Sequence, residues 1–156
     1  MEDSNNEILG TAQAYSGERF FQRNYLPSIA DLLDRLSIDL LKCIFIPEKK
    51  DVYSKEIKDI INDLDEIFRE KDITVTGDLL RAIILLGQFN LHIWHNESAA
   101  RRGEKQDLEK LKLTHGINGL RNKVKNRILN ELGEIKGFDY KTDCIAAEFK
   151  DWEVEI

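Results

Sequence analysis

"TGDLLRAIILLGQFNLHIWHNESAARRG", residues 76–103, is the stretch of this chain that decides its fold. Apolar residues recur through it at helical spacing. Thr76 or Asp78 can cap the start of a helix with a side-chain oxygen, and Gly103 suits the position that follows a last helical turn. The stretch therefore predicts one long helix over residues 77–102.

The inner face of this helix turns polar halfway along. At about 100° per residue, Leu79, Ala82 and Leu86 share the face that must meet the core. Further on, the same face carries a mostly polar or aromatic set: Asn90, Ile93, Trp94, Glu97, Ala100 and Arg101. Polar groups buried without partners are costly, so we expect this set to pair with other side chains or to line a wet cavity. The residues predicted to face solvent are His92, Asn96 and Arg102.

Pro27 and Pro47 bound the segment SIADLLDRLSIDLLKCIFI, which predicts a helix over residues 28–46. Its first apolar stripe consists of Ile29, Leu32, Leu33, Leu36, Leu40 and Cys43. Ile38 and Leu41 begin a second stripe on the opposite side. A helix that is apolar on two sides is usually central in its bundle, and we expect that position here.

Two further main helices are predicted at residues 52–70 and 106–135. The first has one apolar stripe with charged residues elsewhere, which is typical of an outer helix. This stripe consists of Tyr53, Ile57, Ile60, Ile61, Leu64, Ile67 and Phe68. The second helix carries Arg121 among the apolar residues of its stripe. Strand-like alternation is nearly absent from the chain.

These elements predict an all-α fold, an antiparallel helical bundle of four main helices. We expect an extra N-terminal helix over residues 3–24 and a C-terminal tail with a short helix near 143–150. The aromatic residues expected to dock this tail onto the bundle are Phe138, Tyr140, Phe149 and Trp152. The chain is interpreted as one domain over residues 1–156, with its core at about 28–136.

The composition suits a soluble globular protein rich in amphipathic helix, since 42% of the residues are hydrophobic and 33% are charged. No apolar run approaches the roughly 20 residues that span a bilayer, and the N-terminus lacks the pattern of a signal peptide. Cys43 and Cys144 show no metal-binding or redox spacing. We therefore expect a cytoplasmic protein with reduced thiols and no membrane partner.

The formal charge of −6 disfavours a nucleic-acid partner, because neutralisation of phosphates supplies most of the affinity of nucleic-acid binders. Basic residues do gather between positions 110 and 127. We interpret them as one solvated face of the last main helix.

Polar residues on three of the predicted helices are candidates to lie near Arg121. In an antiparallel hairpin, Asn90 lies roughly level with Asn118 and Arg121, given a rise of about 1.5 Å per residue. Asp34 lies one turn before the second apolar stripe of the central helix. An acid at that position is a candidate partner for Arg121.

The segment NLHIWHNESAAR (90–101) resembles the signature N-x-x-L-W-H-x-E-D-x-A-R of a bacterial family of small helical proteins, classed as a domain of unknown function. INGLRN (117–122) is similar to the L-N-x-x-R-N segment of that family, and LLDRLSIDLLK (32–42) resembles a stretch of related helical proteins. The resemblance covers roughly residues 30–130, and Ser98 departs from it where the pattern has Asp. It implies these signature positions: Asn90, Trp94, His95, Glu97, Arg101, Asn118, Arg121 and Asn122. It implies no activity; some members accompany sugar-transfer genes, a hint toward nucleotide sugars or glycans.

Three interpretations of the polar set remain open. In the first, it forms a site for an anionic small molecule such as a nucleotide or sugar phosphate. Arg101 and Arg121 would bind phosphate or carboxylate, Trp94 would offer a flat wall, and Glu97 or His95 would act as general base. In the second, the set is a structural network, with Glu97 and Arg101 paired at i,i+4. In the third, the protein is a non-catalytic interaction module, for instance a homodimer.

A metal site is not favoured by the residue pattern. The candidate ligands are His92, His95, Glu97 and His115, but His92 points away from the core face. No phosphate-binding loop, dinucleotide-binding fingerprint or nucleophile-elbow motif occurs, so the sequence names no cofactor.

Overall fold

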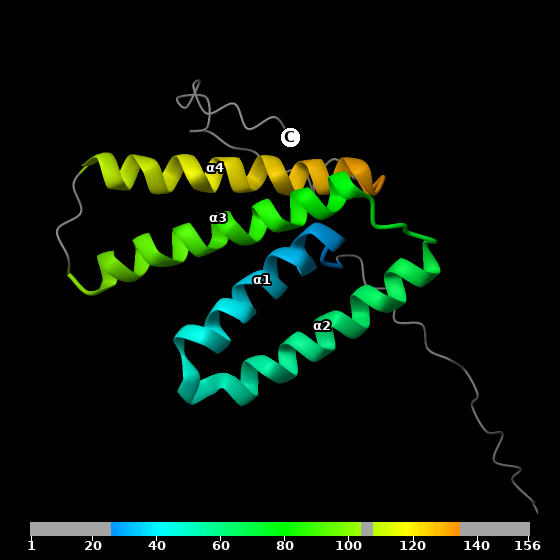
Figure 1. The fold of residues 1–156 in the computed structure, drawn as a ribbon, viewed down its shortest axis with the longest axis horizontal. Helices are drawn as coiled ribbons and strands as arrows, with labels where there is room; N and C mark the ends of the chain where they lie inside the picture. The colour runs from blue at the N-terminus through cyan, green and yellow to red at the C-terminus, as the bar shows by residue number, and fades with distance from the viewer. Residues whose placement is uncertain (1–25, 104–107, 135–156) are drawn as a thin grey trace, which may run out of the picture.

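The computed structural model describes residues 26–103 and 108–134, which form four α-helices and no strand (Figure 1). The elements are α1 (Ile29–Phe45), a short 3-10 helix η1 (Pro47–Lys49), α2 (Lys50–Glu70), α3 (Gly77–Arg101) and α4 (Leu108–Glu131). The predicted all-α bundle of four main helices is therefore confirmed. The helix expected at residues 3–24 and the expected C-terminal tail with its helix near 143–150 lie outside the described residues.

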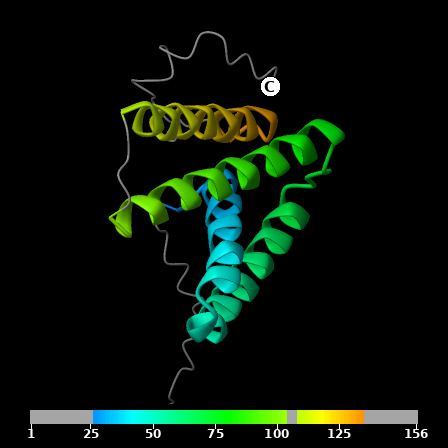
Figure 2. The ribbon, with the colours of Figure 1, turned by 60° about the vertical axis from the view of Figure 1, so that its left-hand side comes forward.

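The four helices form two antiparallel hairpins, α1 with α2 and α3 with α4 (Figure 1). The first hairpin runs steeply across the second (Figure 2). Among the described helices, α1 packs against the other three, whereas α2 packs against α1 alone. The central position predicted for residues 28–46 and the outer position predicted for residues 52–70 are thus both confirmed.

Side-chain caps and a glycine set the helix ends. Thr76 Oγ1 accepts a hydrogen bond from the backbone N–H of Leu79 at 3.1 Å, so Thr76 rather than Asp78 is the N-cap of α3. Ser28 caps α1 in the same way. Gly103 has a φ of 75°, the left-handed conformation that glycine adopts without strain after a helix.

The hydrophobic core fills the end of the molecule where α1 and α3 begin and α4 ends. Its largest fully buried side chains are Ile29, Leu79, Leu86, Val124, Ile128 and Leu129. Beyond Asp34 on α1 and Asn90 on α3, the two helices bury no further apolar side chain completely. The polar residues of the inner faces therefore begin where this core ends.

Two residues of the predicted apolar stripes are exposed instead of packed. Leu40 of α1 and Ile61 of α2 each leave almost half of their surface in solvent. The reason is the arrangement of the helices, because α2 has only α1 as a neighbour and the C-terminal half of α1 lies outside the core. Within the described residues, no helix combines the length and the hydropathy that crossing a bilayer requires.

Candidate functional site

Asp34 and Arg121 form the ion pair that the sequence predicts. Arg121 Nε donates to Asp34 Oδ1 at 3.0 Å, and Nη2 donates to Oδ2 at 2.5 Å. This is the bidentate geometry of a guanidinium–carboxylate pair. Asp34 is only 6% exposed. The pair joins α1 to α4 at the boundary of the hydrophobic core.

Asn90 of α3 completes the connection between the three helices. Its Nδ2 donates to Asp34 Oδ1 at 2.8 Å and to Ser37 Oγ at 2.6 Å. On the other side of the ion pair, Asn118 Oδ1 accepts from Arg121 Nη1 at 3.0 Å. Of the residues predicted to lie level with one another, Asn90 and Arg121 thus both donate to the Asp34 carboxylate, and Asn118 binds Arg121.

Two residues of this cluster were not singled out from the sequence. Lys125 Nζ donates to Asp34 Oδ2 at 3.0 Å and to Asp31 Oδ1 at 2.7 Å. Lys125 lies at i+4 from Arg121, and Asp31 at i−3 from Asp34, so each shares a helix face with a residue that was singled out. The complete cluster contains two acids and two cations, and its charges balance.

The pKa of Asp34 reflects two opposing effects. Burial on its own raises this pKa, because the charged form loses water. The hydrogen bonds and positive charge of Arg121, with further contributions from Asn90 and Lys125, outweigh burial and bring the pKa below its ordinary value of 3.8. The carboxyl group is therefore ionised at neutral pH and holds Arg121 in place.

A cleft of about 880 Å³ opens directly beside this cluster. It lies between the C-terminal halves of α1 and α3, with Arg121 reaching it from α4. The lining residues are Ile38, Lys42, Phe45, Ile46, Asn90, Ile93, Trp94, His95, Glu97, Ser98, Arg101, Arg102 and Arg121. Its volume falls in the range of small-molecule sites, roughly 300–1,000 Å³.

Aromatic side chains form one wall of the cleft. Phe45 stacks on Trp94 with ring centroids 5.9 Å apart and an angle of 22° between the planes. The ring of His95 meets Phe45 edge-on, with centroids 5.3 Å apart. Phe45 still leaves 43% of its surface in solvent. The cleft therefore presents a surface of packed aromatic rings that remains accessible to a ligand.

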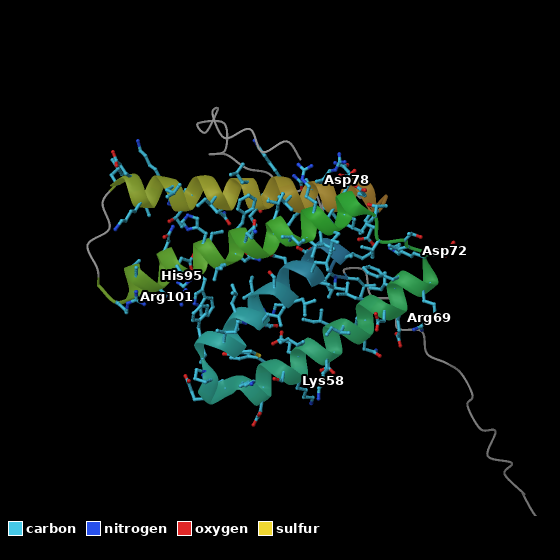
Figure 3. All side chains as sticks on the ribbon, viewed as in Figure 1. Lys58, Arg69, Asp72, Asp78, His95 and Arg101 are labelled. Carbon is cyan, nitrogen blue, oxygen red and sulfur yellow. The ribbon has the colours of Figure 1, made fainter. Side chains whose placement is uncertain are left out.

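Glu97 and Arg101 lie at the rim of the cleft, where α3 approaches its C-terminal end. Figure 3 shows His95 and Arg101 in this part of α3, at the opposite end from Asp78. Arg101 Nη2 donates to Glu97 Oε2 at 3.2 Å, so the predicted i,i+4 pair is confirmed.

Glu97 and Arg101 pair with each other and also line an open cleft, the two alternatives that the sequence allowed for polar residues on this face, and neither is buried. The Glu97 side chain is 52% exposed and that of Arg101 is 81% exposed. Both continue the direction of the core stripe, as the helical wheel requires. The stripe simply extends past the end of the core into the open cleft.

Asn96 was predicted to face solvent, and this prediction was wrong. Instead it is partly buried, and its Nδ2 donates to Thr114 Oγ1 of α4 at 3.0 Å. α4 packs along this side of α3, which a single helical wheel does not reveal. His92 and Arg102 are exposed, as predicted.

The eight residues predicted for the site therefore fall into two groups. Those that line the cleft are Asn90, Trp94, His95, Glu97, Arg101 and Arg121. Asp34 and Asn118 lie behind Arg121 and orient its guanidinium. The polar set thus includes both a closed network around Asp34 and an open cleft beside it.

The contribution of α1 to the cleft was missed in the sequence. Lys42 and Phe45 both line it, and Lys42 Nζ donates to Asp39 Oδ1 at 2.6 Å. Asp39 is fully buried and also accepts from Arg35 Nε at 3.2 Å. A signal was present, because Asp39 falls on the first apolar stripe at i−4 from Cys43. An acid in such a stripe requires cationic partners nearby.

Within the part of the chain that the structure describes, no three His, Cys, Asp or Glu side chains are grouped as metal ligands. Comparisons with protein families, with curated proteins and with solved structures find no match to this chain.

Proposed function

We propose that the cleft binds an anionic small molecule of the phosphorylated class, such as a nucleotide or a sugar phosphate. The observation that carries this proposal is the charge of the lining. Among the described lining residues, four are cationic (Lys42, Arg101, Arg102 and Arg121) and one is acidic (Glu97). Acids offset the charges of Arg121, Lys42 and Arg101, but the lining still gathers several cationic N–H donors beside an apolar wall, which favours a ligand that is both anionic and partly apolar.

Arg121 has the geometry of a preorganised hydrogen-bond donor to an anion. Its side chain is 22% exposed, and three bonds to Asp34 and Asn118 fix its plane. A guanidinium has five N–H groups, so two remain for a ligand in the cleft. Asp34 offsets the charge of Arg121. Arg121 therefore acts as an oriented donor, and Arg101 at the rim adds less restrained positive charge.

A catalytic role for Glu97 or His95 is a further part of this proposal. Both line the cleft, and a carboxylate or an imidazole there can act as general base toward a bound ligand. In that case Glu97→Gln retains ligand binding but removes turnover, because the amide cannot accept the proton. If the wild type shows no turnover and Glu97→Gln binds the ligand more weakly, Glu97 contributes to binding alone.

Isothermal titration calorimetry with nucleotides, sugar phosphates and inorganic phosphate tests the proposal. Arg101→Gln is expected to weaken phosphate-ester binding about tenfold, the effect of losing one charge-assisted hydrogen bond of about 1.4 kcal/mol. Arg69→Gln on α2 is the matched control, because Arg69 is exposed and far from Arg101 (Figure 3). The proposal fails if no phosphorylated compound binds, or if the two variants bind equally well.

One observation favours a second function, that of an interaction module. Leu80, Ile84 and Leu91 form an exposed apolar stripe on the side of α3 that no described helix covers. Exposed apolar stripes often mark protein–protein contacts, and a homodimer is the simplest case. Light scattering after size exclusion tests it: a dimer that Ile84→Glu converts to monomer supports this function, and a wild-type monomer contradicts the homodimer.

A further inference from the structure

We infer that the ligand of the cleft is a nucleotide whose base lies against Phe45 and Trp94. The base donates a hydrogen bond to the side-chain amide oxygen, Oδ1, of Asn90. This inference rests on the proposed anion-binding function and selects one of the two ligand classes that the function allows. Three features of the cleft carry it: the chemistry of its wall, the orientation of the Asn90 amide, and the spacing of residues along α3.

The wall of the cleft suits a nucleobase better than a sugar ring. Its apolar lining residues are Ile38, Phe45, Ile46, Ile93 and Trp94. Apart from the charged side chains, the polar residues of the described lining are Asn90, His95 and Ser98, and the His95 ring packs against Phe45. A sugar ring against this wall would leave most of its hydroxyls without partners, which is costly. A nucleobase has two apolar faces. Aromatic side chains can stack on any of the bases, because every base has a π-face.

Asn90 presents an oriented acceptor at the inner end of the cleft. Both hydrogens of its Nδ2 are used, by Asp34 at 2.8 Å and by Ser37 at 2.6 Å. The ionised Asp34 can only accept hydrogen bonds, so the amide cannot be turned around. The remaining polar atom is Oδ1, which accepts no hydrogen bond from any described residue. A ligand group that meets Asn90 must therefore be a donor, such as the amino group or ring N–H of a base.

The spacing along α3 matches the length of a nucleotide. Asn90, Trp94 and Arg101 stand at i, i+4 and i+11 on one face of the helix. The rise of 1.5 Å per residue places Trp94 about 6 Å from Asn90 and Arg101 about 10 Å beyond Trp94. A base at Trp94 can therefore reach Asn90 with its edge, while the phosphate of the same molecule extends toward Arg101.

Calorimetry on the full chain separates this inference from the function on which it rests. The probes are the monophosphates of adenosine, guanosine, cytidine and uridine, with ribose 5-phosphate and inorganic phosphate. At least one nucleotide is expected to bind tenfold or more tightly than ribose 5-phosphate. If ribose 5-phosphate binds as tightly as every nucleotide, the nucleotide inference is overturned and the anion-binding function stands. If no probe binds, both are overturned.

Phe45→Ala tests the base-binding wall, with Ile44→Ala as its matched control. Ile44 is the neighbouring exposed residue of α1 and is not among the lining residues. Phe45→Ala is expected to weaken nucleotide binding about tenfold and to leave ribose 5-phosphate binding unchanged. Equal losses for both ligands would contradict contact between the base and Phe45. Circular dichroism spectra of the two variants establish that both remain folded.

The Asn90 contact is tested from the side of the ligand, because a variant at this buried position would disturb the Asp34 cluster. Methyl groups replace the donor hydrogens of the tightest-binding base, as in N6,N6-dimethyl adenosine monophosphate compared with the parent compound. The methylated nucleotide is expected to bind at least tenfold more weakly. Unchanged affinity would show that the base does not donate to Asn90, and would overturn the inferred orientation.

Discussion

Asp34 accepts four hydrogen bonds, from Asn90 on α3 and from Arg121 and Lys125 on α4. Each carboxylate oxygen accepts two of them. The donors of the cluster therefore occupy all of the lone-pair positions of the carboxylate. Replacing a buried ion pair by apolar groups can be harmless, but removing one member leaves an uncompensated charge. This residue therefore links the stability of the bundle to the orientation of Arg121 in the cleft.

Asp34→Asn is expected to lower the free energy of unfolding by about 2–4 kcal/mol, because Arg121 loses its counter-charge. The estimate is less than for a fully buried pair, since Arg121 remains partly exposed. Urea unfolding measures the change. Asp65→Asn on the exposed face of α2 is the control, expected to change stability by less than about 0.5 kcal/mol. Equal stability of the two variants would contradict the central role of Asp34.

The depressed pKa of Asp34 also predicts how stability depends on pH. The folded state binds this proton more weakly than the unfolded state, whose carboxyl pKa is near the ordinary value of 3.8. The stabilisation is therefore complete above that value and is lost as the pH falls through it toward the lower folded pKa. Urea midpoints between pH 7 and pH 2.5 should fall less steeply for Asp34→Asn than for the wild type. If the urea midpoints of the wild type and Asp34→Asn fall equally steeply with pH, the lowered pKa of Asp34 is contradicted.

At the scale of elements, α3 is one continuous helix that passes through two environments. Its first half packs Leu79, Ala82 and Leu86 into the core, and its second half carries Trp94 and Arg101 along the cleft. Nothing in the backbone separates the halves. A helix that is anchored in the core at one end holds the cleft residues at its other end in a defined register.

Thr76 anchors the start of α3, so its loss should destabilise the whole bundle. Thr76→Ala is expected to cost about 1–2 kcal/mol, because the first turn loses its cap and the hydroxyl also donates to Glu131 at 3.0 Å. Thermal unfolding of this variant is compared with that of Thr74→Ala, an exposed threonine two residues earlier. A melting temperature for Thr76→Ala that matches the control would show that the cap contributes little.

At the scale of the whole molecule, the two hairpins are unequally held. α3 and α4 pack along each other and both contact α1, whereas α2 contacts α1 alone among the described helices. The buried residues of α2 are Ile60 and Leu64, against nine buried residues in α4. Glu134, which follows α4, connects the two hairpins. Its side chain accepts a hydrogen bond from the backbone N–H of Ile29 at the start of α1, at 2.9 Å, and pairs with Lys71 at the end of α2.

Native-state hydrogen exchange should therefore show that α2 opens before the rest of the bundle. Few buried contacts mean a low local free energy of opening, so α2 amides should exchange at least tenfold faster than those of α4 around Val124. Leu64→Ala should accelerate exchange in α2 more than in α4. Uniform protection across all four helices would instead show that the bundle opens as a single unit.

Much of the fold could be predicted because helix formation leaves local signals. Apolar spacing at 3.6 residues, the flanking prolines and the Thr76 cap determine where helices begin and end, and these signals need no knowledge of neighbours. The Asp34–Arg121 pair was also predictable, because an acid and a base in apolar stripes both require a partner. Asp39 carried the same signal, although it was not singled out.

The sequence by itself determined the four main helices, the directions of their side chains and most of the residues that α3 and α4 contribute to the cleft, but not the contribution of α1. Only the tertiary structure decided where the core ends, and therefore that Glu97 and Arg101 are exposed while Asn96 is held by Thr114. The physical reason is that periodicity gives each side chain an angle around its own helix. Whether that angle meets a neighbour or solvent depends on how the helices cross, and the crossing results from all of their contacts together.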